Sequence, residues 1–311
     1  MNAHRTPRPI LALVILLTVP ILLGAALAPY AFNGLQALGE HTDALGKLTN
    51  ARFERVTSRI VMILTALILV PVIRLTGLWP AVRAGLTGSP ERWRALATSL
   101  ALGLASMAAV FAFGWINDAF VVSPKFTGWL PFTGYFLAFL AGAAFIGLFE
   151  EVFFRGIFFG ALRTQLAFPV AAFLSSVFFS AIHFFRPLYP TVIEHAAWYT
   201  GFAIIPHLFD RFVFEHDVWF ALTLFMMGLT LSLHYERRGH LYTIIGLHAG
   251  WVLAMRTGSQ LFDRNHEVFP VFIGRSDTLT KGLLALAVIT LFFIAECLRA
   301  RRDRGNDRLS G

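Results

Sequence analysis

The chain has 311 residues, of which 57% are hydrophobic and 14% are charged, and its formal net charge is +8. This composition excludes an ordinary soluble domain, because several apolar runs reach the ~20 residues that cross a bilayer. The positive charge does not indicate nucleic-acid binding, since the basic residues are not grouped with stacking aromatic residues. The single cysteine, Cys297, excludes an internal disulfide and lies in an apolar run, where a thiol nucleophile is not expected.

The apolar runs predict an all-α polytopic membrane helix bundle of about eight transmembrane helices, with both termini in the cytoplasm. Basic residues set this orientation, because cytoplasmic loops carry an excess of lysine and arginine. The first run is read as an uncleaved span rather than a signal peptide, since it is longer than a typical signal core. The predicted spans cover residues 10–30, 58–78, 95–116, 132–163, 168–185, 218–234, 241–257 and 281–298.

These spans predict a multi-pass protein of the cell membrane. The chain is expected to divide into three parts. Residues 1–130 hold the first three helices and their loops. Residues 131–257 form a helical core, and residues 258–311 hold a loop, the last helix and a basic cytoplasmic tail.

Three connecting segments carry expectations of their own. Residues 33–57 are read as an external loop and residues 80–94 as a cytoplasmic connection. Residues 192–209 are aromatic but interrupted by charged residues, which favours an interfacial helix or a re-entrant piece.

Two adjacent carboxylates and an arginine interrupt the fourth predicted span, in the order Glu150, Glu151 and Arg155. An ionisable group at membrane depth is costly, so it is rare without a partner or a task. On an α-helix Glu151 and Arg155 are i,i+4 neighbours and can pair, whereas Glu150 points about 100° away. A structural ion pair accounts for Glu151 and Arg155 but leaves Glu150 unexplained. We therefore expect Glu150 to be a functional carboxylate.

Two histidines lie on other predicted spans, His183 on the fifth and His248 on the seventh. Either one alone is more often a hydrogen-bonded core residue than a functional one. Together with Glu150 they supply the groups that activate water and protonate a leaving amine. The same three side chains suit a divalent metal such as zinc, so a metal-dependent site and a metal-free site both stay open. We expect Glu150, His183 and His248 to converge on one polar pocket in the cytoplasmic half of the bundle.

Motifs of other hydrolases are absent from the sequence. There is no Gly-x-Ser-x-Gly nucleophile motif, and His266-Glu267 lacks the second histidine of a zinc-protease helix. Ser176 and Ser180 are read as interhelical hydrogen-bonding residues. Small residues in the fourth span are expected to permit close helix packing; they are Gly142, Gly147, Gly156 and Gly160.

The order of the motifs resembles one family. The Glu-Glu-x-x-x-Arg motif is followed by Phe179-x-x-x-His183 and then by His248 on a later span. In this the chain resembles the CPBP family, the CAAX-processing and bacteriocin-processing intramembrane proteases, also called the Rce1-like or Abi group. The resemblance covers roughly residues 135–256.

The resemblance implies an all-helical membrane endopeptidase whose cavity opens toward the cytoplasmic side. It implies that Glu150 activates a water molecule together with His183. Glu151 and Arg155 would hold the geometry of the site, and His248 would help to bind the oxyanion. The implied partners are the lipid bilayer and a membrane-associated protein or peptide substrate, of CAAX type or another membrane-proximal kind. The family has been described both as metal-dependent and as glutamate-type without a metal, which leaves the cofactor open.

One departure from the family pattern favours an alternative function. The family commonly has asparagine or aspartate four residues after the late histidine, and here that residue is Val252. Losing one oxyanion donor can lower a rate by ~10²–10³. Ser176, Ser180 and Trp251 are candidate replacements for the donor. The alternatives to a protease are a weak or inactive member that acts as a membrane binding or immunity protein, and a proton-coupled transporter, which the lack of two matching halves disfavours.

Overall fold

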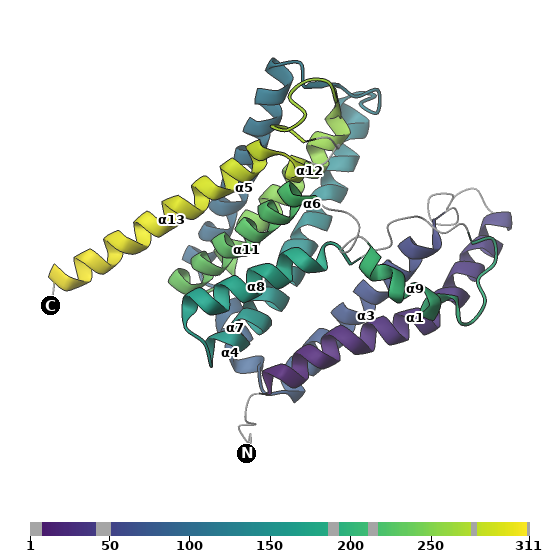
Figure 1. Cartoon of the computed structure of the whole chain (residues 1–311), viewed down its shortest axis with the longest axis horizontal. Helices are drawn as coiled ribbons and strands as arrows, with labels where there is room; N and C mark the ends of the chain where they lie inside the picture. The colour runs from purple at the N-terminus through teal and green to yellow at the C-terminus, as the bar shows by residue number, and fades with distance from the viewer. Residues whose placement is uncertain (1–7, 42–50, 186–192, 211–216, 275–278, 310–311) are drawn as a thin grey trace. The chain divides into compact units, whose positions relative to one another are not determined.

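The computed structural model describes residues 8–41, 51–185, 193–210, 217–274 and 279–309. These residues are helical apart from short connections and one two-stranded ribbon (Figure 1). Six of the described helices are long and apolar enough to cross a membrane, so the chain is a multi-pass integral membrane protein with an all-α fold. They are Pro9–Gly39, Phe53–Leu75, Pro90–Ile116, Trp129–Arg163, Val218–Arg238 and Leu283–Arg302.

The predicted count of eight spans is not confirmed, because two of the expected helices differ from these six. Helix α8 (Phe168–Ile182) has 15 residues, which rise only about 22 Å. Helix α12 (Tyr242–Leu261) has 20 residues but is less apolar. Twelve residues of α12 are buried by other helices, and a helix enclosed in protein can carry polar residues that lipid would not tolerate.

The first helices are longer than the sequence suggested. Helix α1 runs from Pro9 to His41 and α3 from Phe53 to Leu75. The expectation of a loop over residues 33–57 is therefore wrong at both of its ends, because the apolar helices continue through polar positions there; residues 42–50 lie outside the described residues. The expected connection at residues 80–94 contains a short helix, α4 (Trp79–Leu86).

Two compact units divide the chain, and the division does not follow the sequence order. One unit holds Met1–Pro80 and Ala181–His216, and the other holds Ala81–Ser180 and Asp217–Gly311. The division of the sequence at residues 130 and 257 stays a prediction.

In the first unit, α1 and α3 pack against each other, and α9 (Thr200–Ile204) packs on α1. The Asn33 side chain binds both backbone groups of Ala196, donating to its carbonyl at 2.8 Å and accepting from its N–H at 2.9 Å. The described part of the segment expected to be interfacial thus contains α9 and η3 (Pro206–Phe209), with Ala196 anchored to α1. Residues 186–192 and 211–216 lie outside the described residues.

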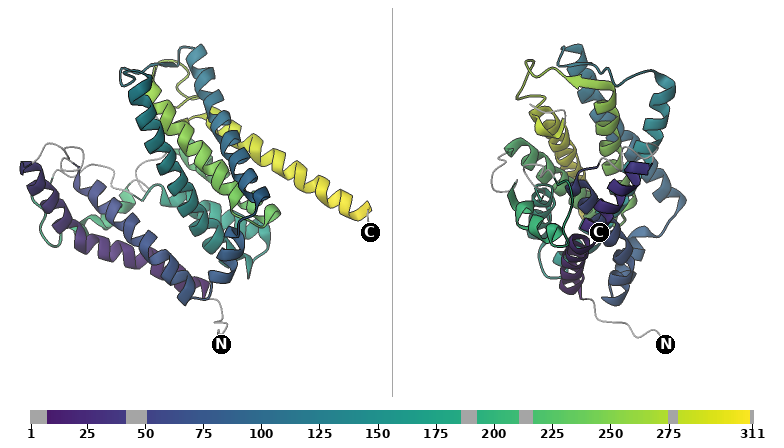
Figure 2. Two further views of the ribbon diagram at one scale, coloured as in Figure 1. Left: turned by 180° about the vertical axis from the view of Figure 1, so that it is seen from behind. Right: turned by 90° about the vertical axis from the view of Figure 1, so that its right-hand side faces the viewer.

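The second unit is a bundle around α12, which packs against α5 (Pro90–Ile116), α6 (Trp129–Glu151) and α11 (Val218–Arg238) (Figure 2). Two of its helices begin at capping residues: the Ser89 side chain accepts from Arg92 N–H at the start of α5, and the Asp217 side chain accepts from Phe220 N–H at the start of α11. Its last long helix is α13 (Leu283–Leu309).

Helices α5 and α12 run in the same direction and touch through their backbones. A Cβ atom on Gly246 would lie 2.3 Å from the carbonyl oxygen of Leu96, and one on Gly250 would lie 2.3 Å from that of Leu100. Only glycine fits at such distances, as in the small-x-x-x-small contacts of membrane helices. Of the four glycines expected to permit close packing in the fourth span, Gly147 does so, since its Cβ would lie 3.0 Å from the Ile245 carbonyl oxygen. The other three have no contact below 3.6 Å.

The two ends of this bundle differ in charge. The start of α5, the end of α11 and the loop into α12 meet at one end, where Leu241 N–H donates to the Gly85 carbonyl and Arg163 pairs with Glu236. The other end carries the antiparallel ribbon of β1 (Phe120–Val122) and β2 (Phe262–Arg264). Arg163, Arg237 and Arg238 lie at the first end, so the charge rule assigns this basic end to the cytoplasm.

The glycine contact predicts a sharp difference between two conservative substitutions. Gly250→Ala places a methyl group against the α5 backbone and should destabilise the protein by about 1–3 kcal/mol through overpacking. Gly142→Ala is the matched control, because nothing lies within 4 Å of a Cβ at that position of α6. Thermal unfolding in detergent measures both. Equal midpoints for the two variants would contradict the proposed contact.

The charge difference between the ends predicts the orientation. Reporter fusions after Arg238 and after Arg302 should both report the cytoplasm, and a fusion after Lys125 should report the opposite side. An external signal from the fusion after Arg302 would rule out the arrangement with both termini inside.

Candidate functional site

The acidic pair lies where α6 ends and the helix changes its winding. Glu151 is the last residue of α6, and the chain continues without a break as a π-helix, η2 (Val152–Phe159), and then as α7 (Gly160–Arg163). Long π-helical segments are rare, and they occur frequently at functional sites. All residues of η2 except Phe158 are buried, so this turn is held from every side.

Glu151 and Arg155 form the ion pair that their spacing predicts. Arg155 Nη1 donates to Glu151 Oε1 at 2.9 Å, and both side chains are almost fully buried. The second terminal nitrogen, Nη2, donates to the Gly228 carbonyl on α11 at 3.3 Å. The guanidinium also lies 4.7 Å from the centre of the Phe179 ring, a cation–π distance. Arg155 therefore has a partner on α6, one on α8 and one on α11.

His248 binds the same carboxylate from the opposite side. Its Nδ1 atom lies 2.6 Å from Glu151 Oε1. A carboxylate that pairs with an arginine accepts hydrogen bonds, so we assign Nδ1 as the donor in this contact. Gly246 and Gly250 stand two residues before and after His248, so they face α5 while His248 faces the other way, toward α6. The glycine contact thus positions the histidine.

Glu150 differs from Glu151 in its exposure to solvent and in its hydrogen-bond partners. Its side chain is 24% exposed, and its Oε2 atom lies 3.9 Å from Nε2 of His248. That distance is too long for a direct hydrogen bond. Glu150 Oε2 has no hydrogen-bond partner, and neither has Glu151 Oε2. The site therefore presents two unused acceptor atoms beside an imidazole nitrogen.

His183 follows the last residue of α8 and belongs to the first compact unit, whereas the other four predicted site residues belong to the second. The structure therefore brings together Glu150, Glu151, Arg155 and His248. The convergence of His183 with Glu150 and His248 stays a prediction.

The side chains considered as replacement oxyanion donors are engaged elsewhere. Ser176 Oγ donates to the Ala172 carbonyl at 2.6 Å, and Ser180 Oγ donates to the Ala221 carbonyl at 2.9 Å. Trp251 is fully buried and its Nε1 donates to Ser106 Oγ. Val252 packs with Ala143 and Leu253 in an apolar cluster. All three candidate donor groups thus make other hydrogen bonds in this structure.

The three side chains named for a metal site are divided between the two compact units, so their assembly stays a prediction. Within the described part of the chain, no group of three histidine, cysteine, aspartate or glutamate side chains is arranged to hold a metal ion. His248 Nδ1 is bound to Glu151, which leaves only Nε2 for a ligand. A metal-dependent site and a metal-free site both stay open, and we derive no step through a metal.

Two contacts of the site were not predicted from the sequence, although Phe179 was named there as part of a motif. The Gly228 carbonyl is a backbone group, and no side-chain pattern identifies it. The Phe179 ring contacts both Arg155 and His248, with ring centres 6.1 Å apart in the second case. The Gly-x-x-x-Gly pattern around His248 was the available signal for the α5 contact.

The buried pair predicts a large loss of stability when one partner is removed. Glu151→Ala leaves Arg155 buried without its carboxylate and should cost about 3–5 kcal/mol. Glu236→Ala is the matched control, because its pair with Arg163 is partly exposed and such pairs contribute about 0–1 kcal/mol. Unfolding in detergent compares the two variants. A stable Glu151→Ala protein would show that Arg155 is satisfied without the carboxylate.

Comparison with known proteins finds one family model that matches part of the chain. Residues 131–254 match a family model described as type II CAAX prenyl endopeptidase Rce1-like. The matched region contains all five predicted site residues. No curated protein and no solved structure matches the chain at a significant level.

Proposed function

Residues 131–254 place the chain in the Rce1-like family, and on this basis we propose that it is an intramembrane endopeptidase that hydrolyses a peptide bond of a membrane-associated protein or peptide. The observation that supports the proposal most is that two adjacent carboxylates have different environments. Glu151 is buried and bound on both sides, whereas Glu150 is partly exposed and has an unused oxygen facing His248. A site that only stabilised the fold would have no need of the second carboxylate.

In the proposed reaction, Glu150 is the general base. A water molecule between Glu150 and His248 gives a proton to Glu150, and its oxygen attacks the carbonyl carbon of the scissile bond. The electron pair of the C=O double bond moves to the oxygen, which becomes the oxyanion of a tetrahedral intermediate. The proton held by Glu150 then passes to the leaving nitrogen, and the C–N bond breaks. His183, by resemblance to the family, assists Glu150.

His248 has the chemistry to stabilise the oxyanion. For that task Nε2 must donate a hydrogen bond, which requires a protonated ring because Nδ1 already carries a proton. Glu151, 2.6 Å from Nδ1, stabilises the positive charge that results. Arg155 holds Glu151 in place, so we assign Glu151 and Arg155 as positioning residues and Glu150 and His248 as catalytic ones. The mechanism needs no metal, and the chain's own residues balance every proton.

The family description points to a substrate of CAAX type, with a prenylated cysteine near its carboxyl end. A membrane-embedded site next to the basic end of the bundle suits a peptide whose lipid lies in the bilayer and whose polar end reaches the cytoplasm.

The alternative function is that of a family member without catalysis, which binds a membrane partner. Val252 favours it, because the side chains examined as replacement donors are all engaged in other hydrogen bonds. Under this alternative the folded protein binds a prenylated peptide and does not cleave it.

The decisive variant is Glu150→Gln, which keeps the size of the side chain and removes the base. Cleavage of a farnesylated peptide by the purified protein should fall by about 10²–10⁴-fold, the usual contribution of general acid–base catalysis. The unfolding midpoint should not change, since Glu150 is outside the buried pair. Glu236→Gln serves as the control carboxylate and should cleave normally.

Two further measurements distinguish a metal-free protease from a metal-dependent one and from a protein that only binds the peptide. Cleavage that survives a chelator in protein shown by elemental analysis to be metal-free supports the metal-free mechanism, and cleavage lost on chelation and restored by zinc contradicts it. A folded wild-type protein that binds the farnesylated peptide without cleaving it would establish the alternative.

A further inference from the structure

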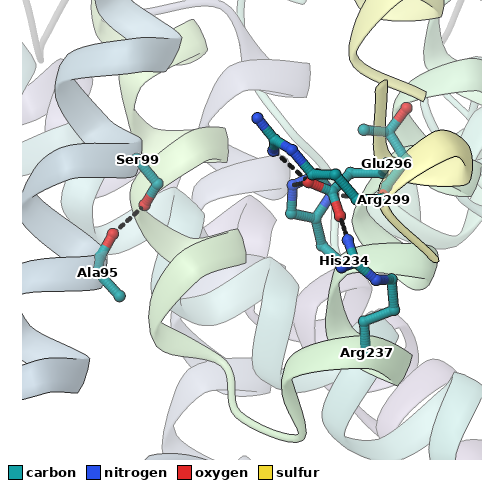
Figure 3. Close-up of polar contacts among 7 residues, drawn as sticks. Ala95, Ser99, His234, Arg237, Glu296 and Arg299 are labelled. Carbon is teal, nitrogen blue, oxygen red and sulfur yellow. Dashed lines mark hydrogen bonds and ion pairs between the residues drawn. The ribbon is translucent and has the colours of Figure 1, made fainter. Parts of the chain in front are cut away.

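A buried carboxylate joins α13 to the end of α11 (Figure 3). Glu296 of α13 is 1% exposed. His234 Nε2 lies 3.1 Å from its Oε1 atom, and Arg299 Nη1 donates to the same oxygen at 2.7 Å. Arg237 donates to the other oxygen, Oε2. Two arginines thus share one carboxylate, so the cluster has an excess of positive charge even when His234 is neutral. The proposed reaction uses none of these four residues.

Further arginines extend the same faces of the two helices beyond this cluster. Arg238 follows His234 by four residues on α11, and Arg302 follows Arg299 by three on α13. Residues three or four apart on a helix are neighbours. Both added side chains are exposed, and neither pairs with a carboxylate of the described residues. We call Arg237, Arg238, Arg299 and Arg302 the arginine patch.

The carboxylates near the arginine patch do not neutralise it. Glu296 is shared by two arginines, and Glu236 is bound by Arg163 through Nε and Nη2. Residues 303–309, the rest of α13, contain two arginines and two aspartates and leave the charge balance unchanged. The four arginines of the patch therefore face a single carboxylate, and that one is buried.

The arginine patch begins where α13 stops being apolar. Ile294 and Leu298 are exposed, as expected of side chains that face lipid. Arg299 comes directly after Leu298, and its side chain is 60% exposed. The apolar segment that is long enough to cross a membrane, Leu283–Arg302, ends within the patch. The patch therefore lies at the depth where phospholipid headgroups replace acyl chains.

We propose that the arginine patch binds the phosphate of an anionic phospholipid of the cytoplasmic leaflet, between the ends of α11 and α13. A guanidinium group presents its N–H donors in a planar fork that matches phosphate oxygens. Glu296 holds Arg237 and Arg299 in place on different helices, which lowers the cost of ordering them when a ligand binds. A free phosphate ion has similar oxygens, but only a lipid is anchored at the depth of Leu298.

Arginines near the end of a helix also stabilise that helix without any ligand. Arg237 and Arg238 are in the last turn of α11, where they interact favourably with the helix dipole. The same reason does not apply to Arg299 and Arg302, because α13 continues to Leu309. The dipole effect is present without lipid, so lipid binding itself has to be measured. The proposal does not rest on the catalytic function.

A lipid titration tests the site. Native mass spectrometry of the protein purified in detergent gives its apparent affinities for phosphatidylglycerol and for phosphatidylcholine with the same acyl chains. Phosphatidylglycerol should bind about tenfold more tightly or better, because the arginines attract its negative charge. Inorganic phosphate at the same concentration should not displace it. Equal affinities for the two lipids would overturn the proposal, and displacement by inorganic phosphate would overturn the assignment to a lipid.

A double variant tests which arginines form the site. Arg238→Gln combined with Arg302→Gln removes two charges and leaves the contacts of Glu296 intact. The affinity for phosphatidylglycerol should fall roughly 30-fold, about fivefold for each arginine. The matched control is Arg83→Gln combined with Arg94→Gln, which removes two exposed arginines at the same end of the bundle and should bind like the wild type.

An equal loss of affinity in the two double variants would show a diffuse attraction to the basic end of the bundle and overturn a defined site. If the variant of the arginine patch does not fold, Arg302→Gln alone decides, since its side chain is exposed and outside the buried cluster. That variant should bind phosphatidylglycerol about fivefold more weakly. Unchanged binding would overturn the proposal.

Discussion

The site depends on the two hydrogen bonds made by the carboxylate of Glu151. One of its oxygens accepts from Arg155 at 2.9 Å and from His248 at 2.6 Å, so a single atom joins α6, η2 and α12. Bringing a carboxylate and a guanidinium out of water is expensive, and the attraction between them offsets that cost only when the geometry is good. The packing around Arg155, with the Phe179 ring on its face and the Gly228 carbonyl on its edge, supplies that geometry. Glu150 is then free for another task.

The fold class and one contact of the site could be predicted from the sequence. The helical membrane fold followed from apolar runs of sufficient length, and the Glu151–Arg155 pair followed from a spacing of four residues. The count of eight spans is not confirmed, because α8 is short and α12 is less apolar than the six candidate spans. The ends of α1 and α3 were misplaced because polar residues continue a helix as readily as they form a loop.

The inner geometry of the site was beyond sequence reasoning. The change to π-helical winding after Glu151 has no composition signal, and the backbone carbonyl of Gly228 has no side chain to identify it. The hydrogen bond between His248 and Glu151 joins residues 97 positions apart, and only the packing of α12 on α5 and α6 determines it. The valine at position 252 was visible in the sequence. The hydrogen bonds that engage Ser176, Ser180 and Trp251 required the contacts of each side chain.

The glycine contact between α5 and α12 also sets an order of events during synthesis. Gly103 and Gly250 meet although 147 residues separate them, so α5 is complete long before its partner exists. At about 5–20 residues per second, α5 waits roughly 7–30 s for α12 to emerge. Throughout that interval the surface of α5 around Gly103 is without α12 and faces lipid or other newly made helices. Factors that shelter inserted segments would therefore act on this protein at α5, and a chain released early would expose that surface to the quality-control machinery.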